Sequence, residues 1–364
     1  NTSRNSSEYI SSISSVGGTV HSGFNGSRGF NNADHPSGGG AGSAGNAVQI
    51  TSNSDTSQVP HGGDGMSTDI TGSTVYFGGG GGGTIYNNNS RAGGNGGKGG
   101  GGGGSHNQSS GGGNAGTGDT NGLNNGANGG TGDDAHGGDA GANTGGGGAA
   151  HDDGVGGTGG SGIVIVRFVT SSQASYSKSG GTASTIGSDT MIQWLSGSGN
   201  FVPNANGNGR VLIVGAGGSA GNGLAGAGAG AEVVEYTNFQ FIAGTTYNIS
   251  VAGTTSQPSG NENASNSNGN DGADSSFGSQ TAKGGSKGYS RYITVGGSAK
   301  PNQGGTGSHD SNNVGNQVHD PNDKSSIAYA DTVSATGSFT GNNITASSST
   351  NKMGAVITYQ DNAG

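Results

Sequence analysis

GGNGGKGGGGGG, residues 93–104, is the stretch that decides the fold. Shorter runs of the same kind occupy residues 78–83 and 145–148, and glycine makes up 87 of the 364 residues. Each glycine loses more backbone freedom on folding than any other residue and has no side chain to bury. Such runs either stay disordered or gain stability from main chain packed directly on main chain, which favours a structural or adhesive protein over an enzyme.

Glycine-rich chains can form the extended helix of polyproline II, which has about three residues per turn and no internal hydrogen bonds. With glycine facing a neighbour, two such helices approach closely enough for N–H···O=C bonds and Cα–H···O contacts between their main chains. A flexible glycine-serine linker is the alternative. We expect ordered helices over residues 78–160, because strands and isolated bulky residues such as Ile85, Tyr86 and Leu123 accompany the runs, and a linker needs neither.

The apolar residues gather in short blocks that are typical of β-strands. No segment has the apolar stripe of an amphipathic helix built from good helix formers. The predicted fold class is therefore all-β with extended polyglycine (polyproline II-type) helices, arranged as glycine-rich β-sandwich modules with almost no α-helix. The strand-like blocks are residues 74–77, 163–168, 191–195, 211–214, 233–236, 239–242, 247–251 and 355–359.

The two halves of the chain resemble each other, as the repeats of arrays and fibres do. Apolar strands end both halves, at residues 162–168 and 354–359, and a serine-rich stretch followed by Gly-Gly recurs at residues 7–18 and 274–285. Residues 173–364 are predicted to form a complete glycine-rich β-module. Residues 1–172 are predicted to be the back portion of such a module, with its N-terminal strands missing or supplied by a neighbour.

Composition and charge narrow the function classes. Apolar residues counted without glycine make up 26 % and charged residues 10 % of the chain, both below the roughly 40 % and 25 % of an ordinary globular protein counted the same way. The net charge is −9 and no basic run is present, so nucleic acid is not an expected partner. No apolar stretch approaches the roughly 20 residues of a membrane span, so membrane insertion is not expected. Cysteine is absent from the sequence, which excludes disulfides and thiolate metal sites within it.

Several pieces of the sequence form a recognisable set. GRVLIVGAGG at residues 209–218 follows the block at 191–201 and precedes GTTYNISV at 244–251 and DSSF at 274–277. Residues 70–83 and GGSGIVIVRF at 159–168 supply the remaining pieces. The set is similar to a glycine-rich module of phage tail fibres and adhesins, most specifically in the 211–214 and 163–168 strands. The resemblance implies packed glycine helices and a role in surface fibres, on virions or on cells.

One motif suggests a nucleotide site at first sight. Residues 211–220 form a strand-like block followed by G-x-G-x-x-A, with Glu232 and Glu235 near the spacing of a ribose-binding acid. That motif needs a helix after the glycines, and residues 221–230 are glycine-rich and poor helix formers. No G-x-S-x-G elbow joins a strand to a helix. We therefore expect no cofactor, no catalytic residues and no enzyme activity.

A calcium site is a weak candidate. Residues 129–134 match the start of a calcium-binding nonapeptide repeat, but the pattern occurs once, and His136 stands where an apolar residue is required. Solvated loop tips are the favoured interpretation. The oxygen and imidazole groups that could gather around Ca²⁺ are those of Asp133, Asp134, His136, Asp139, His151 and Asp152.

The first functional hypothesis is an extracellular or virion-surface adhesin of the tail-fibre type. A rigid glycine-rich scaffold would present loops to a glycan or protein on a host surface. The candidate loops are residues 87–91, 105–110 and 261–270. The candidate contact residues are Tyr86, Asn87, Asn88, Asn89, Arg91, Tyr289 and Tyr292.

The second hypothesis is a self-assembling extracellular filament or matrix subunit whose partners are copies of itself. A half-module exposes unpaired strand edges, and a neighbouring subunit could supply the missing strands. Ice binding by flat faces of glycine helices is a more remote alternative. The candidate assembly strands contain Ile163, Val164, Ile165, Val166 and Phe168 in the first half, and Val356, Ile357 and Tyr359 in the second.

Overall fold

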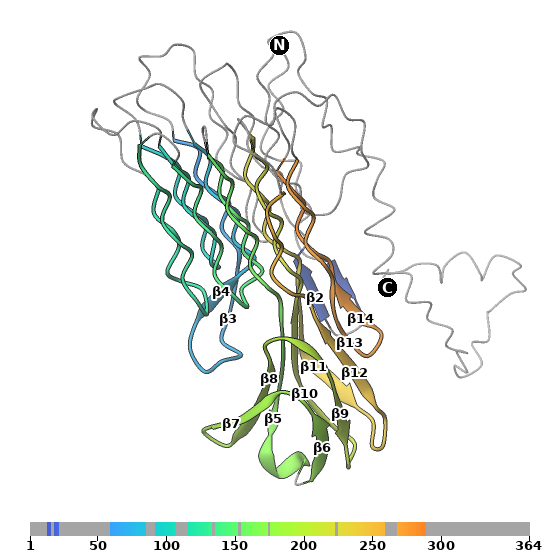
Figure 1. The fold of residues 1–364 in the computed structure, drawn as a ribbon. Coiled ribbons are helices and arrows are strands. Elements are labelled where there is room, and N and C mark those ends of the chain that lie inside the picture. The colour runs from blue at the N-terminus through green and yellow to red at the C-terminus, as the bar shows by residue number, and fades with distance from the viewer. Residues whose placement is uncertain are drawn as a thin grey trace, which may run out of the picture.

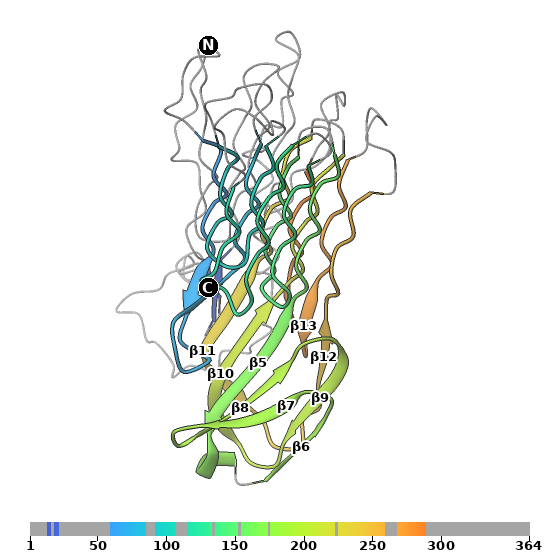
Figure 2. The same ribbon diagram turned by 60° about the vertical axis from the view of Figure 1, so that its left-hand side comes forward.

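The computed structural model has two parts, a sandwich of β-sheets and a bundle of extended glycine-rich segments that rises from one end of it (Figure 1). Figure 2 shows the same division from the side. The structure describes the backbone of residues 13–15 and 18–21, together with residues 59–84, 92–106, 116–132, 135–151, 154–173, 175–222, 225–258 and 268–288.

The larger sheet has seven strands, and every neighbouring pair in it is antiparallel. The longest strands form its centre, where both faces are covered. In spatial order the strands are β1 (Ile13–Ser15), β2 (Gly18–His21), β11 (Val233–Phe241), β10 (Gly207–Val214), β5 (Ile163–Val169), β8 (Asp189–Trp194) and β7 (Thr182–Ile186).

A five-stranded antiparallel sheet covers one face of the larger sheet, and a short hairpin covers the other. One turn of 3-10 helix, η1 (Thr170–Gln173), joins β5 to β6. The five strands in spatial order are β14 (Gln280–Ala282), β13 (Ser275–Phe277), β12 (Tyr247–Val251), β9 (Gly197–Pro203) and β6 (Tyr176–Ser179); the hairpin is β3 (Met66–Thr68) and β4 (Val75–Phe77).

Two apolar cores follow from the two-residue period of the strands. Along β5, Val164, Val166 and Phe168 enter the core between the sheets, and Ile163 and Ile165 enter the core beneath the β3–β4 hairpin. The inter-sheet core also holds the buried Trp194 and a network of aromatic rings. Those rings belong to Phe168, Tyr176, Phe201, Tyr236, Phe239, Phe241, Tyr247 and Phe277.

In its described residues the bundle has no regular strand pairing and no apolar core, yet most of its glycines are buried. Its hydrogen bonds repeat every three residues. In the segment after β4, the N–H groups of Gly79 and Gly82 donate to the carbonyls of Gly99 and Gly102 (3.2 and 2.9 Å). The three-residue repeat is that of a polyproline II helix whose polar groups point to several neighbours.

The segment after β10 shows how one extended helix uses three neighbours at once. The N–H groups of Gly215 and Gly218 donate to residues 232 and 229, those of Ala216 and Ser219 to residues 273 and 270, and those of Gly217 and Ala220 to residues 160 and 157. Each pair of donors lies three residues apart and reaches carbonyls three residues apart. The main chain of this segment is therefore bonded on three sides, as a buried backbone requires.

Close approach of main chains explains why so many positions are glycine. A Cβ on Gly97 would overlap the carbonyl oxygen of Gly63, and a Cβ on Gly217 would overlap that of Gly146. No side-chain movement relieves such an overlap, because the obstructing atom belongs to the backbone. The turn at Gly99 and Gly100 adds a second reason, since both residues have positive φ (103° and 82°) that other residues rarely adopt.

The predicted fold class is confirmed: the described residues form antiparallel sheets and extended glycine helices, without an α-helix. The strand block at 355–359 lies outside the described residues. The division at residue 172 concerns internal repetition and stays a prediction; the structure adds that β5, from one side of that boundary, pairs with β8 and β10 from the other. In the part of the chain that the structure describes, no helix is long and apolar enough to cross a membrane.

Replacing one buried glycine should show how much the bundle depends on bare main chain. We expect Gly97→Ala to lower the free energy of unfolding by at least about 2 kcal/mol, because the added methyl group overlaps backbone that cannot move aside. The matched control is Gly253→Ala, where a Cβ meets nothing within 4 Å. Denaturant unfolding of both variants checks the prediction, and equal losses at the two positions would contradict it.

Candidate functional site

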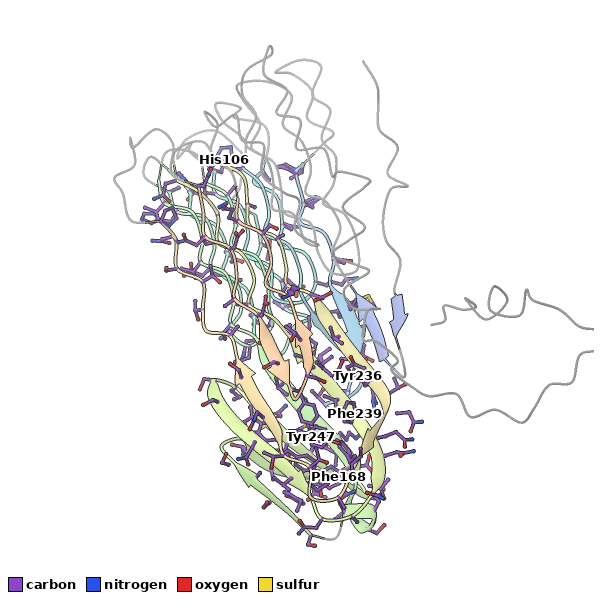
Figure 3. All side chains as sticks on the ribbon, turned by 90° about the vertical axis from the view of Figure 1, so that its right-hand side faces the viewer. His106, Phe168, Tyr236, Phe239 and Tyr247 are labelled. Atoms are coloured by element: carbon purple, nitrogen blue, oxygen red, sulfur yellow. The ribbon has the colours of Figure 1, made fainter. Side chains whose placement is uncertain are left out.

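Several described segments of the bundle begin or end at the same place, the end farthest from the sandwich (Figures 1 and 3). His106, labelled in Figure 3, marks this end, which we call the distal end. The short turns inside the bundle, at residues 98–100 and 142–145, lie at the opposite end beside the sheets. The pairs of described residues at which these segments end and begin again are Thr84 and Ala92, His106 and Gly116, Gly132 and Ala135, His151 and Gly154, Asn222 and Ala225, and Pro258 and Asn268.

The interior of the distal end is polar. Thr84, Ser105, His106 and His151 are fully buried there. The Thr84 hydroxyl donates to the Ser105 carbonyl (2.5 Å), and the His106 N–H donates to the Gly130 carbonyl (3.0 Å). These contacts hold neighbouring extended segments together at the distal end.

Two of the candidate metal ligands act as hydrogen-bond acceptors for the adjacent segment. His136 Nδ1 accepts the Val155 N–H (3.2 Å), and Asp139 Oδ1 accepts both the N–H and the hydroxyl of Thr158 (2.7 and 2.8 Å). The two acceptors are three residues apart, and so are the two donors. The side chains therefore accept N–H groups that main-chain carbonyls of a neighbouring segment accept elsewhere in the bundle. We call such a pair of acceptors a side-chain clamp.

The calcium prediction is not supported by the described part of the site. Within the described ranges, no group of three or more His, Cys, Asp or Glu side chains could hold a metal ion. The predicted ligands Asp133, Asp134 and Asp152 lie outside those ranges. Calcium binding thus stays a prediction, while the structural use of His136 and Asp139 is clear.

The same clamp occurs at two other edges of the bundle. His61 Nδ1 accepts the Asn95 N–H (2.9 Å), and Asp64 Oδ1 accepts the Lys98 N–H (3.0 Å). Burial lowers the pKa of His61, which favours the neutral imidazole, whose Nδ1 can accept a hydrogen bond. The spacing of acceptors and donors is again three residues.

The third clamp joins the segments before β13 and after β14. Asp274 Oδ1 accepts the Gly284 N–H and Asp271 Oδ1 accepts the Lys287 N–H, both at 3.0 Å. Asp274 also pairs with Lys283 through its other oxygen (2.7 Å). Sequence reasoning missed these clamps; the available signal was an Asp, Asn or His at three-residue spacing beside a glycine run.

None of the seven predicted contact residues can be placed. Tyr86, Asn87, Asn88, Asn89, Arg91, Tyr289 and Tyr292 lie outside the described residues. Of the 261–270 loop, residues 268–270 are described, and Asn270 has a structural role: its N–H donates to the Ser219 hydroxyl and its side-chain amide to the Ser256 carbonyl (both 2.8 Å).

The predicted assembly strand of the first half lies inside the sheet of its own chain. Strand β5 pairs along its length with β10 and β8, and Ile163 to Val166 are fully buried. Val356, Ile357 and Tyr359 of the second half lie outside the described residues.

A pair of arginines, which sequence reasoning also missed, fixes the β3–β4 hairpin on the larger sheet. Arg167 and Arg210 face each other across β5 and β10. Arg167 pairs with Asp189 (2.8 Å), while Arg210 pairs with Asp69 and Glu235 (2.6 and 2.5 Å). The hydrogen bond and charge of Arg210 lower the pKa of Asp69. The ion pairs balance two cations that would otherwise repel at the sheet surface.

Glu232 is the buried carboxyl where the bundle meets the sheet. Its side chain accepts the Lys283 N–H (2.7 Å), and its own N–H donates to the Lys283 carbonyl (3.0 Å). Burial raises the pKa of Glu232 to about 7, against the opposing effects of that hydrogen bond and of the Lys283 charge. The sequence motif that would make Glu232 a ribose-binding acid requires a helix after its glycines. The segment between β10 and Glu232 is extended and carries no helix in its described residues.

Comparison with known proteins supports the general class of the chain. Residues 194–364 match a family described as a glycine-rich domain. No curated protein and no solved structure gives a significant match. The match begins at the last residue of β8, so the central strand β5 lies outside it. What the comparison supports is similarity to a glycine-rich domain over the second half of the chain.

Removing one clamp should weaken the bundle modestly. We expect Asp139→Ala to lower the free energy of unfolding by about 1 kcal/mol, because two donors on Thr158 lose their acceptor. Asp139→Asn keeps an oxygen acceptor and should restore most of the loss. Asn125→Ala, at an exposed position of the bundle, is the control. Thermal unfolding of the three variants checks this, and identical stability of all three would argue against a clamp.

The unfolding free energy should depend on the protonation of Glu232. Because the folded pKa is raised above the ordinary 4.5 to about 7, its stabilising contribution is complete below pH 4.5 and is lost as the pH rises through 7. Glu232→Gln stays neutral, so the stability difference between wild type and variant should shift in favour of the variant from pH 5 to pH 8. Parallel pH profiles of the two proteins would contradict the assignment.

Proposed function

We propose that the protein is an extracellular, non-enzymatic structural or adhesive fibre protein, of the kind found in phage tail fibres and adhesins. The observation that supports this most is the bundle itself, whose described segments repeatedly begin or end together at the distal end, away from the sandwich (Figures 1 and 3). The sandwich is then the base, the bundle a rigid stalk, and the departing segments the groups presented to a glycan or protein on a host surface. Recognition by loops on a rigid scaffold is a common arrangement.

The contacts between segments of the bundle support the role of a stalk. Its segments are bonded to neighbours on several sides, and their spacing is set by direct main-chain contact. An adhesive loop on such a base loses less entropy on binding than one on a flexible tether, because its two ends are already fixed. The composition of residues 86–91, which combine an aromatic ring, three amides and one cation, suits polar surface recognition.

Exchanging that segment tests the function. Residues 86–91 are replaced by a glycine-serine sequence of equal length, and binding of wild type and variant to an immobilised glycan array is compared. We expect wild type to bind and the variant to lose at least about tenfold in affinity, as the loss of one or two good contacts predicts. The melting temperatures of both proteins are measured in parallel, so that a loss of binding through unfolding is recognised as such.

A matched control changes the other end of the molecule. Val169 and Ile242 are exposed apolar residues of the sandwich (47 % and 59 % exposed), and a Val169→Ser, Ile242→Ser variant should bind like wild type. If this control lost binding while the variant with residues 86–91 exchanged kept it, the adhesive surface would lie on the sandwich and not in residues 86–91. Absence of binding by wild type would contradict the adhesive function.

Self-assembly by strand exchange is a second candidate. It is favoured because β5, which precedes η1 in the chain, pairs with β8 and β10, which follow η1. Strand β5 fills the slot between β10 and β8, and main-chain bonds such as Gly217 N–H to the Gly160 carbonyl (2.9 Å) continue the contact into the bundle. A second copy offers identical surfaces. Copies could therefore join head to tail if residues before η1 filled the slot of a neighbour.

The absence of cysteine from the sequence makes this exchange easy to test. Cysteines at positions 169 and 189, which are Cα partners across β5 and β8, should form a disulfide wherever β5 occupies the slot. Exchange predicts a ladder of disulfide-linked copies on a non-reducing gel of concentrated protein. A single monomer band with the disulfide formed would contradict exchange and leave the adhesive proposal untouched.

A further inference from the structure

The outer face of the five-stranded sheet carries an acceptor triplet for N-linked glycans, Asn248-Ile249-Ser250, within β12. Because successive residues of a strand point to opposite faces, Ile249 enters the inter-sheet core while Asn248 and Ser250 face solvent. Both side chains that the triplet requires are therefore on one exposed face.

The surroundings leave room for a bulky group on this face. The Cα partners of Asn248 and Ser250 on β9 are Asn200 and Ser198, and Ser250 is also opposite Ser276 on β13. All three neighbours are small and uncharged. A sugar attached at Asn248 would thus meet a flat polar surface, with no large or charged side chain opposite on either neighbouring strand.

The Asn248 amide is also unused by the fold. Among the described residues its side chain makes no hydrogen bond, although its main-chain carbonyl accepts the Gly278 N–H (2.7 Å). Its neighbour Asn200 differs, because Asn200 Oδ1 accepts the Ser179 N–H (3.0 Å). Modification of Asn248 would therefore break no internal contact, and modification of Asn200 would break one.

We propose that Asn248 is a glycosylation site that carries an N-linked oligosaccharide, an inference that rests on the proposed extracellular location and on export of the chain by a cell. The donor would be a lipid-pyrophosphate-linked oligosaccharide, and transfer would take place before β12 is closed between its neighbours. The bond from the anomeric carbon to the pyrophosphate breaks, a bond from that carbon to Asn248 Nδ2 forms, and Nδ2 loses one proton. The glycan covers the outer face of the sheet and keeps it from stacking on another sheet.

Peptide mass spectrometry of the protein purified from its natural source tests the proposal. The peptide that contains Asn248 should carry additional mass in increments of sugar residues, with fragmentation placing it on Asn248. Asn238 is the internal control, because it is exposed on β11 but its triplet, Asn238-Phe239-Gln240, lacks the hydroxyl residue. An unmodified Asn248 in this protein would overturn the proposal.

Variants expressed in the natural source show whether the added mass depends on the acceptor triplet. Asn248→Gln and Ser250→Ala should both remove the added mass at position 248, Ser250→Thr should keep it, and Asn238→Gln should leave it unchanged. Persistence of the mass in Ser250→Ala would contradict N-linked transfer. Since both positions are exposed, the variants should fold; if one does not, the mass of the unaltered protein alone decides.

Discussion

Hydrogen bonding between bare main chains is the interaction on which the rest of this structure depends. A Cβ at Gly97 or Gly217 would occupy the place of a neighbouring carbonyl group, so the packing exists only because these residues have no side chain. Glycine is costly to order, and each segment offsets that cost by bonding to neighbours on several sides. The bundle thereby buries its main chain without relying on large apolar side chains.

The sandwich sets the register that the bundle needs. Strand β10 continues directly into the segment at 215–222, β12 into the segment at 252–258, and the segment at 154–162 runs into β5. A strand fixed in the sheet by its apolar alternation therefore fixes the start of the glycine helix that follows or precedes it. Glycine helices alone could slide past one another by three residues, since their bonding pattern repeats at that interval. The apolar core removes this freedom, and the clamps formed by residues such as Asp139 and Asp274 reinforce the choice.

Sequence reasoning reached the fold class and the central strands because those depend on local patterns. The blocks at 163–168, 211–214 and 247–251 correspond to β5, β10 and β12, and Trp194 is buried in the core. The arginine pair and the side-chain clamps depend on partners distant in the chain. Arg167 and Arg210 face each other only after β5 and β10 have paired, and nothing near either residue identifies the other. The structural role of His136 and Asp139 was missed for the same reason. The sequence marked both as polar groups that could bind calcium, but it could not show that they accept hydrogen bonds from Val155 and Thr158.

Hydrogen–deuterium exchange of the glycine segments tests the central claim most directly. The account predicts that amides within residues 93–104, including those of Gly97, Gly101 and Gly102, exchange far more slowly than in an unstructured peptide, because they donate to main-chain carbonyls inside the bundle. Peptides that cover β10 supply the internal reference for a folded sandwich. Exchange of residues 93–104 at the rate of a free peptide, while β10 stays protected, would show that the glycine runs are tethers and would contradict the account.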